Sequence, residues 1–71
     1  MAKFEILEAG PVLGTRKNGI EVRLNFMSWY GKMPVWDIRN WDGDKAQGGI
    51  ALTPEMAEAL RDELDKIDFS R

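Results

Sequence analysis

Hydrophobic and polar residues alternate along two central stretches of the chain, residues 20–30 and 35–41. In the first stretch the apolar positions are Ile20, Val22, Leu24 and Phe26, and the positions between them are Glu21, Arg23, Asn25, Met27 and Trp29. In the second, Trp36 and Ile38 share one face, and Asp37, Arg39 and Trp41 share the other. Because successive side chains of a strand point to opposite faces, both stretches are predicted to be strands of one sheet.

Shorter strands are predicted on either side of these two. Phe4–Glu8 favours a first strand, and Gly10-Pro11 interrupts it, with a continuation through Val12-Leu13 past a bulge or kink left open. Asn18-Gly19 tolerates positive φ at both central positions of a type I′ turn, so it predicts a hairpin. Residues 42–49 are polar and glycine-rich, which predicts a loop before a short last strand over residues 50–52.

The C-terminal quarter has the start signals of a helix. Thr53 can cap it, Pro54 suits the first helical position, and Glu55 lies where the helix dipole favours an anion. An apolar stripe follows at spacings of four, four and three residues, and it consists of Met56, Leu60, Leu64 and Ile67 with Ala57 beside it.

Together these elements predict a single α+β domain over residues 1–71, in which four antiparallel strands precede one C-terminal helix (β-β-β-β-α). We expect the helix to cover the apolar face of the sheet. The sheet side of that core is expected to be Val22, Leu24, Phe26, Trp36 and Ile38, and the helix side Met56, Leu60 and Leu64.

Composition narrows the function. The 71 residues include no Cys and no His, which removes thiolate nucleophiles, Cys-based zinc sites and the commonest general base. We therefore expect a protein that is not an enzyme and that needs no metal or cofactor. No apolar run is long enough to span a membrane, and the N-terminus lacks a signal-peptide pattern, so a cytoplasmic protein is expected.

The charges are divided unevenly along the chain. Ten basic and 12 acidic side chains give a net charge of −2, which by itself argues against a phosphate-bearing partner. Residues 1–52 carry seven basic and six acidic side chains, whereas residues 53–71 carry three and six. The predicted sheet is thus +1 and the predicted helix −3, so a mildly basic sheet is backed by an acidic helix.

The second face of the sheet has an unusual composition for a surface in contact with water. Two tryptophans and two arginines on adjacent strands favour single-stranded nucleic acid, because aromatic rings stack on unpaired bases while cations follow the backbone. The contact residues predicted from this face and from the loops beside it are Arg23, Asn25, Met27, Trp29, Lys32, Arg39, Trp41 and Lys45. An alternative function is a small protein-interaction module that uses the same exposed aromatic face. An alternative role for Arg39 is an ion pair with Asp37, two residues away on that face.

Two motifs, Asp37-Ile38-Arg39-Asn40-Trp41 and, after a polar loop, residues 49–55 (Gly-Ile-Ala-Leu-Thr-Pro-Glu), resemble the transcriptional positive cofactor four family. The likeness is strongest to its small bacterial, YdbC-like branch, and it extends over about residues 3 to 68 through Leu24-Asn25 and Ser28-Trp29.

The resemblance implies a homodimer that binds single-stranded DNA along curved sheets, largely without sequence preference. Trp41 would stack on a base, with Arg39 in the same motif, and Trp29 or Tyr30 would supply a second aromatic contact with Lys32 just beyond it. The loop before the last strand offers only Lys45, which implies weaker or more salt-sensitive binding than in eukaryotic members. The implied roles are coactivation or regulation of transcription, replication or repair. RNA is a second candidate ligand, and the transcription machinery is a candidate partner. In a bacterium the protein is expected at the nucleoid.

Overall fold

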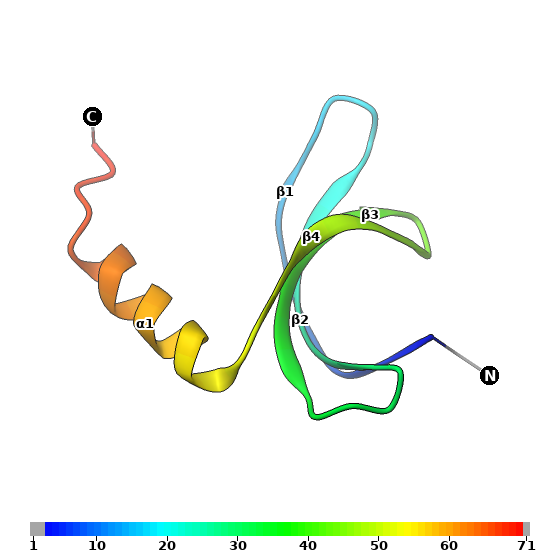
Figure 1. The fold of residues 1–71 in the computed structure, drawn as a ribbon. Helices are drawn as coiled ribbons and strands as arrows, with labels where there is room; N and C mark the ends of the chain where they lie inside the picture. The colour runs from blue at the N-terminus through cyan, green and yellow to red at the C-terminus, as the bar shows by residue number, and fades with distance from the viewer. Residues whose placement is uncertain (1–2, 71) are drawn as a thin grey trace.

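The computed structural model describes residues 3–70, which form a four-stranded antiparallel sheet followed by one helix (Figure 1). The elements are β1 (Phe4–Thr15), β2 (Glu21–Trp29), β3 (Val35–Asp42), β4 (Lys45–Leu52) and α1 (Pro54–Asp65). The strands lie in sequence order, β1-β2-β3-β4, so each pairs with its neighbour in the chain. The predicted fold class and element order are confirmed.

Strand β1 is longer than predicted, because it runs through Gly10-Pro11 instead of ending there. Its pairing with β2 shifts register at several points, including between Ala9 and Val12. An edge strand tolerates proline at such a bulge, because one side of its backbone needs no ladder partner. The continuation that the sequence left open is therefore confirmed.

The β1–β2 hairpin forms where Asn18-Gly19 predicted it, with a different turn. Of the two residues Asn18 and Gly19, only Gly19 has a positive φ, at 79°. Its N–H donates to the Arg16 carbonyl at 3.1 Å, and the Arg16 N–H donates to the Ile20 carbonyl at 2.7 Å. This is a three-residue loop with glycine in the left-handed position, so the predicted type I′ turn is wrong.

The predicted polar loop over residues 42–49 is also wrong, because most of it belongs to β4. Asp42 pairs with Lys45, and the connection is the two-residue turn Gly43-Asp44, where Gly43 has a φ of 59°. Glycine with positive φ at the first central position is the pattern of a type II′ hairpin turn. Backbone pairing here overrode a composition that is typical of loops.

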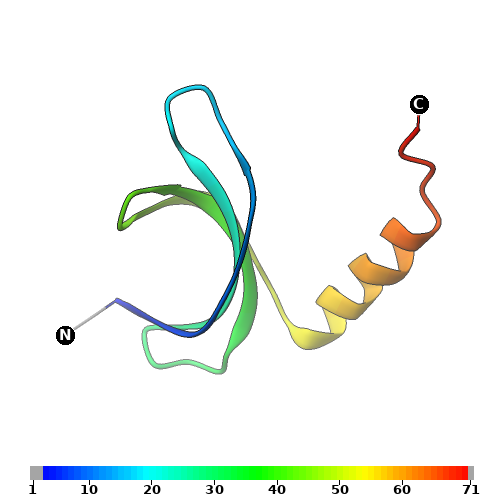
Figure 2. The same cartoon turned by 180° about the vertical axis from the view of Figure 1, so that it is seen from behind.

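The sheet is strongly curled, as the two views in Figures 1 and 2 show. Its concave face carries Asn25, Met27, Trp29, Asp37, Arg39 and Trp41, and its convex face carries Val22, Leu24, Phe26, Trp36 and Ile38. Phe4 of β1 reaches over β2 to Trp41 of β3, with ring centroids 5.4 Å apart at an interplanar angle of 77°. The alternation correctly predicted which residues share a face.

The concave face, expected to be exposed, is the more buried of the two. Met27 and Asp37 are fully buried, and Trp41 is 2% exposed. The convex residues of β2 and β3 are only half-buried. The expectation that the convex face forms the core was wrong because curling brings the side chains of the concave face together.

Helix α1 begins as predicted and then leaves the sheet. The Thr53 Oγ1 accepts the Met56 N–H at 3.2 Å, and Pro54 holds the first helical position. The helix approaches only β3 and β4, and none of its residues is buried. Met56 is 55% exposed and Leu64 is 42% exposed, so the predicted cover over the sheet is wrong within one protomer.

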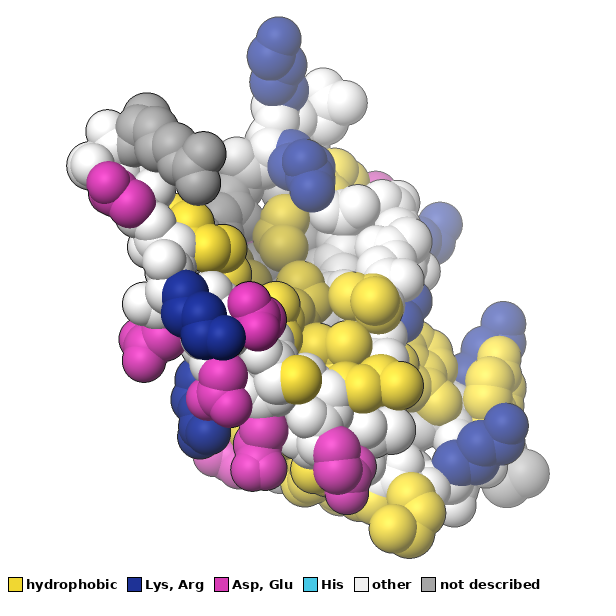
Figure 3. Space-filling model, turned by 60° about the vertical axis from the view of Figure 1, so that its left-hand side comes forward, with side chains coloured by type: hydrophobic (Ala, Val, Ile, Leu, Met, Phe, Trp, Pro, Cys, Tyr) yellow, Lys and Arg dark blue, Asp and Glu magenta, His cyan; other side chains and the backbone are white. Residues whose placement is uncertain are grey.

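An open apolar groove of about 620 Å³ separates the helix from the convex face. It is lined by Leu13, Leu24, Trp36, Ile38 and Leu52 of the sheet, and by Ala57, Leu60, Arg61, Leu64, Asp65 and Phe69 of the helical segment. Figure 3 shows a group of hydrophobic side chains in the middle of this face of the molecule, with most of the acidic side chains to its left and below it. Among residues 3–70, no helix is long and apolar enough to cross a membrane.

Candidate nucleic-acid interface

A cleft of about 500 Å³ opens on the concave face. It is lined by residues of all four strands and of the turns beside them: Lys3, Phe4, Trp29, Tyr30, Arg39, Asp44, Lys45, Ala46 and Gln47. The curl brings the start of β1 and the β3–β4 hairpin, which belong to opposite edges of the sheet, to the same opening. Aromatic rings and two lysines therefore meet around one hollow.

Tyr30 stands at the rim of this cleft in a rare backbone conformation. Its φ is 53° and that of Gly31 is 72°, and the Lys32 N–H donates to the Trp29 carbonyl at 2.9 Å. Two successive positive φ values define a type I′ turn, which a bulky side chain enters only at a cost. The Tyr30 N–H also donates to the Lys3 carbonyl at 2.8 Å, and the side chain is left 67% exposed.

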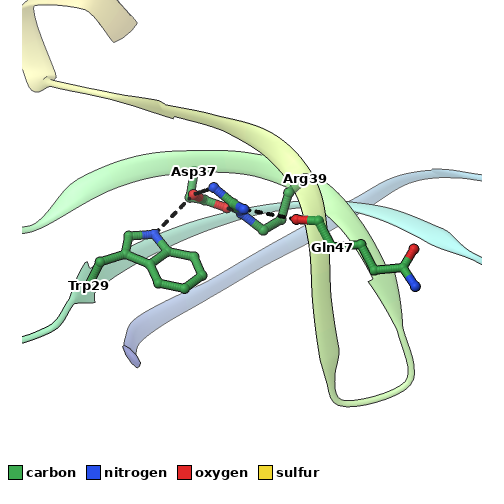
Figure 4. A network of polar contacts seen from close by, with 4 residues as sticks. All are labelled: Trp29, Asp37, Arg39 and Gln47. Carbon is green, nitrogen blue, oxygen red and sulfur yellow. Dashed lines mark hydrogen bonds and ion pairs between the residues drawn. The ribbon is translucent and has the colours of Figure 1, made fainter. Parts of the chain in front are cut away.

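Beneath the rim, Asp37 joins the concave face to the cleft through a polar network (Figure 4). Its carboxylate accepts from Arg39 Nε at 2.6 Å and from Arg39 Nη2 at 2.7 Å, which makes the ion pair bidentate. It also accepts from Trp29 Nε1 at 3.1 Å. The alternative in which Arg39 pairs with Asp37 is thus confirmed.

The same guanidinium connects two further parts of the cleft. The Arg39 Cζ atom lies 4.6 Å from the centre of the Trp29 ring, a distance at which a cation and an aromatic face attract. Arg39 Nη1 donates to the Gln47 carbonyl of β4 at 2.9 Å. Arg39 therefore spends most of its bonding capacity inside the protein, and only its remaining N–H groups can meet a ligand.

The structure divides the nine predicted contact residues into two groups. The cleft brings together Trp29, Tyr30, Arg39 and Lys45. The remaining five lie elsewhere: Asn25, Met27 and Trp41 are buried in the concave face, Arg23 is ion-paired with Glu21 at 2.6 Å, and Lys32 is exposed in the turn after Tyr30.

Trp41 in particular differs from its prediction. Phe4 packs edge-on against it, the Arg23 Cζ atom lies 5.4 Å from the centre of its ring, and only 2% of the residue is exposed. The expectation of an exposed Trp41 ring is therefore wrong in this conformation. Its Nε1 and the Asn25 Nδ2 have no hydrogen-bond partner among residues 3–70.

Five lining residues were missed by the sequence interpretation, and they are Lys3, Phe4, Asp44, Ala46 and Gln47. Phe4 pairs with Trp29 across the β1–β2 ladder, with ring centroids 5.3 Å apart. A correct register for the first hairpin would have brought Phe4 and Lys3 to Trp29. Asp44, Ala46 and Gln47 could not be placed, because residues 42–49 were expected to be a loop.

The cleft offers stacking surfaces and cations, and it lacks the groups of a metal centre. Within residues 3–70 no cluster of three or more acidic side chains has the geometry to hold a metal ion. The fold and the cleft thus define a small α+β protein with a curled antiparallel sheet, an aromatic and basic hollow, and an uncovered amphipathic helix.

Comparison with known proteins supplies a family for this chain. It is 36% identical over 68 residues to an uncharacterized protein of Treponema pallidum (strain Nichols), which covers 93% of this chain and 80% of that protein. The chain therefore belongs to the same family as the Treponema protein. No family model matches the sequence.

Proposed function

We propose that this protein binds single-stranded DNA without strong sequence preference, through the cleft on the concave face. The observation that carries the proposal is the meeting of Trp29, Tyr30, Lys3 and Lys45 around one hollow. Stacking platforms beside cations are the usual means of binding unpaired bases, since every base has a π-face. Duplex DNA offers such faces only at its ends, so single strands are the preferred ligand.

The lining residues have different roles in this proposal. Tyr30 supplies the main stacking surface, because its ring is the most exposed aromatic group at the rim. Trp29 is held from within by Arg39 and Asp37, and it forms the wall against which a second base packs. Lys3 and Lys45, with Lys32 nearby, neutralise phosphates. Trp41 supports the concave face from inside and makes no contact with a base.

We propose further that two copies associate through the apolar groove. Leu60 and Leu64 of the helix and Ile38 of the sheet face it together, and a protomer of this size gains stability by covering such a surface. Arg61 and Asp65 also line the groove, so a symmetric partner can pair opposite charges there. A homodimer would present two clefts to one strand, which increases avidity.

The proposed setting follows from the ligand. Single strands are exposed during transcription, replication and repair, and the protein is proposed to act on them in the cytoplasm, at the nucleoid if the organism is a bacterium. No catalytic step is part of this function. RNA presents the same stacking faces and phosphates, so its affinity is to be measured beside that of DNA.

The deciding experiment measures fluorescence anisotropy of labelled oligo-dT titrated with the protein, beside a duplex of equal length. We expect the single strand to bind more tightly than the duplex. Tyr30→Ala should weaken oligo-dT binding by about 1–3 kcal/mol, because one stacked base is lost. Met33→Ala is the matched control, since Met33 is an exposed apolar residue of the same loop and does not line the cleft.

Two results would overturn the proposal. Equal affinity of Tyr30→Ala and the parent protein would remove the stacking assignment. No binding of either nucleic acid would instead support the protein-interaction alternative, with the apolar and aromatic surfaces serving a protein partner.

A further inference from the structure

Asp37 is a buried acid directly beneath a site proposed to bind an anion. Its side chain is 0% exposed, so it cannot touch a strand lying in the cleft. By Coulomb's law alone, a negative charge at this place opposes phosphate binding. Its presence therefore calls for a compensating role within the protein.

That role is visible in the groups that the carboxylate holds. Three hydrogen bonds fix the Trp29 indole and the Arg39 guanidinium against the same two oxygens. Arg39 in turn stacks on the Trp29 ring and holds the Gln47 carbonyl. One buried carboxylate thus sets the orientation of the aromatic wall and ties β4, which carries Lys45, to the centre of the sheet.

We propose that Asp37 is a positioning residue for the nucleic-acid interface, which holds Trp29 in the orientation that stacks and fixes the β3–β4 hairpin at the distance that lets Lys45 reach a phosphate. This inference rests on the proposed function. Coulomb's law alone predicts that removing the negative charge of Asp37 strengthens the binding of nucleic acid. A positioning role predicts instead that its removal weakens binding.

The test compares Asp37→Asn with Glu21→Gln. Both substitutions remove one negative charge from the same face, and both break an ion pair with an arginine two residues away. Glu21→Gln leaves the cleft untouched, so its affinity for oligo-dT should equal that of the parent or rise slightly. Asp37→Asn should lose about tenfold in affinity, which is the size of one lost stacking contact.

A second variant keeps an aromatic ring at position 29 and removes the tether. Trp29→Phe retains an aromatic face but lacks the N–H that donates to Asp37. It should also lose affinity, and combining it with Asp37→Asn should cost less than the sum of the two losses, because both changes break one network. If Asp37→Asn does not fold, as judged by circular dichroism, the Trp29→Phe affinity decides the question.

An NMR measurement distinguishes positioning from a general loss of stability. In Asp37→Asn the indole N–H signal of Trp29 should move while those of Trp36 and Trp41 stay in place. Unchanged or tighter oligo-dT binding by folded Asp37→Asn, or parental binding by Trp29→Phe, would overturn the inference while leaving the proposed function standing. Failure of the parent protein to bind oligo-dT would instead remove the proposed function itself.

Discussion

At the scale of single residues, the conformation of Tyr30 is the most unusual feature of the chain. A non-glycine residue with a φ of 53° incurs a cost of about 1–2 kcal/mol, because its Cβ crowds the backbone. Conformations of this kind concentrate at binding sites, where they hold a side chain in a required direction. Here the strain directs an exposed aromatic ring to the rim of the cleft.

Replacing Tyr30 by glycine should therefore relieve the backbone strain while weakening the interface, because the ring is lost. We expect Tyr30→Gly to raise the free energy of unfolding by about 1 kcal/mol relative to Tyr30→Ala, which loses the same ring but keeps a Cβ. Urea denaturation of the two variants provides the measurement. Equal stability of the two would show that the left-handed conformation is unstrained.

At the scale of the elements, two glycines let the edge strands bend closely over the centre of the sheet. A Cβ added to Gly10 would overlap the Leu24 carbonyl oxygen, and one added to Gly49 would overlap the Arg39 Cβ and the Ile38 carbonyl. Near Gly49 the β3–β4 register also shifts. These close approaches are part of the curl that forms the cleft on the concave face.

Gly48 and Gly49 offer a matched pair of substitutions on β4. Gly49→Ala should lower the free energy of unfolding by at least 1–3 kcal/mol, roughly the cost of overpacking, because backbone atoms have to move. Gly48→Ala should have a much smaller effect, since nothing lies within 4 Å of its added Cβ. Thermal unfolding followed by circular dichroism compares them, and similar losses would contradict the role assigned to Gly49.

These elements also show what the sequence could and could not predict. Alternation identified β2, β3 and the sharing of Asp37, Arg39 and Trp41 on one face, because the two-residue period is a local property of strands. It could not tell which face lies inside. That depends on curvature, which arises from register shifts and from the space at Gly10 and Gly49, and these involve residues far apart in sequence.

The candidate site was predicted in part for the same reason. Trp29, Arg39 and Lys45 were identified from their residue types and positions along the chain, and Tyr30 was identified from the family resemblance. The structure places all four at the cleft. Trp41 has the same residue type as Trp29 but lies deeper in the curl. Residue chemistry alone therefore could not separate a surface ring from a buried one.

At the scale of the whole molecule, the affinity for single-stranded DNA should depend clearly on salt, although only a few lysines contact phosphates. With two or three lysines neutralising phosphates, the affinity for oligo-dT should fall about tenfold between roughly 50 and 200 mM salt. Anisotropy titrations over that range measure the slope. Lys45→Ala should make this slope shallower, whereas the control Lys17→Ala, in the β1–β2 hairpin outside the cleft, should leave it unchanged. Salt-independent affinity of the parent protein would contradict phosphate contacts by Lys3 and Lys45.

The proposed dimer predicts a different response from substitutions in the groove. Leu64→Glu places a charge in the apolar surface and should shift the protein to monomers at micromolar concentration. Met33→Glu adds the same charge to an exposed apolar residue outside the groove and should leave the assembly unchanged. Sedimentation velocity reports both, and a parent protein that is already monomeric would contradict the proposal.

The uncovered helix has one more consequence, for hydrogen exchange. A 12-residue helix is marginal in water without tertiary packing, and α1 buries none of its residues within the protomer. Its amide protons are therefore protected mainly when something covers the groove, whereas those of β2 and β3 are protected by the sheet itself. Amide exchange along Pro54–Asp65 should become faster on dilution, whereas exchange in the central strands should not change. The exchange rate of the helix would therefore measure how much of the protein is dimeric.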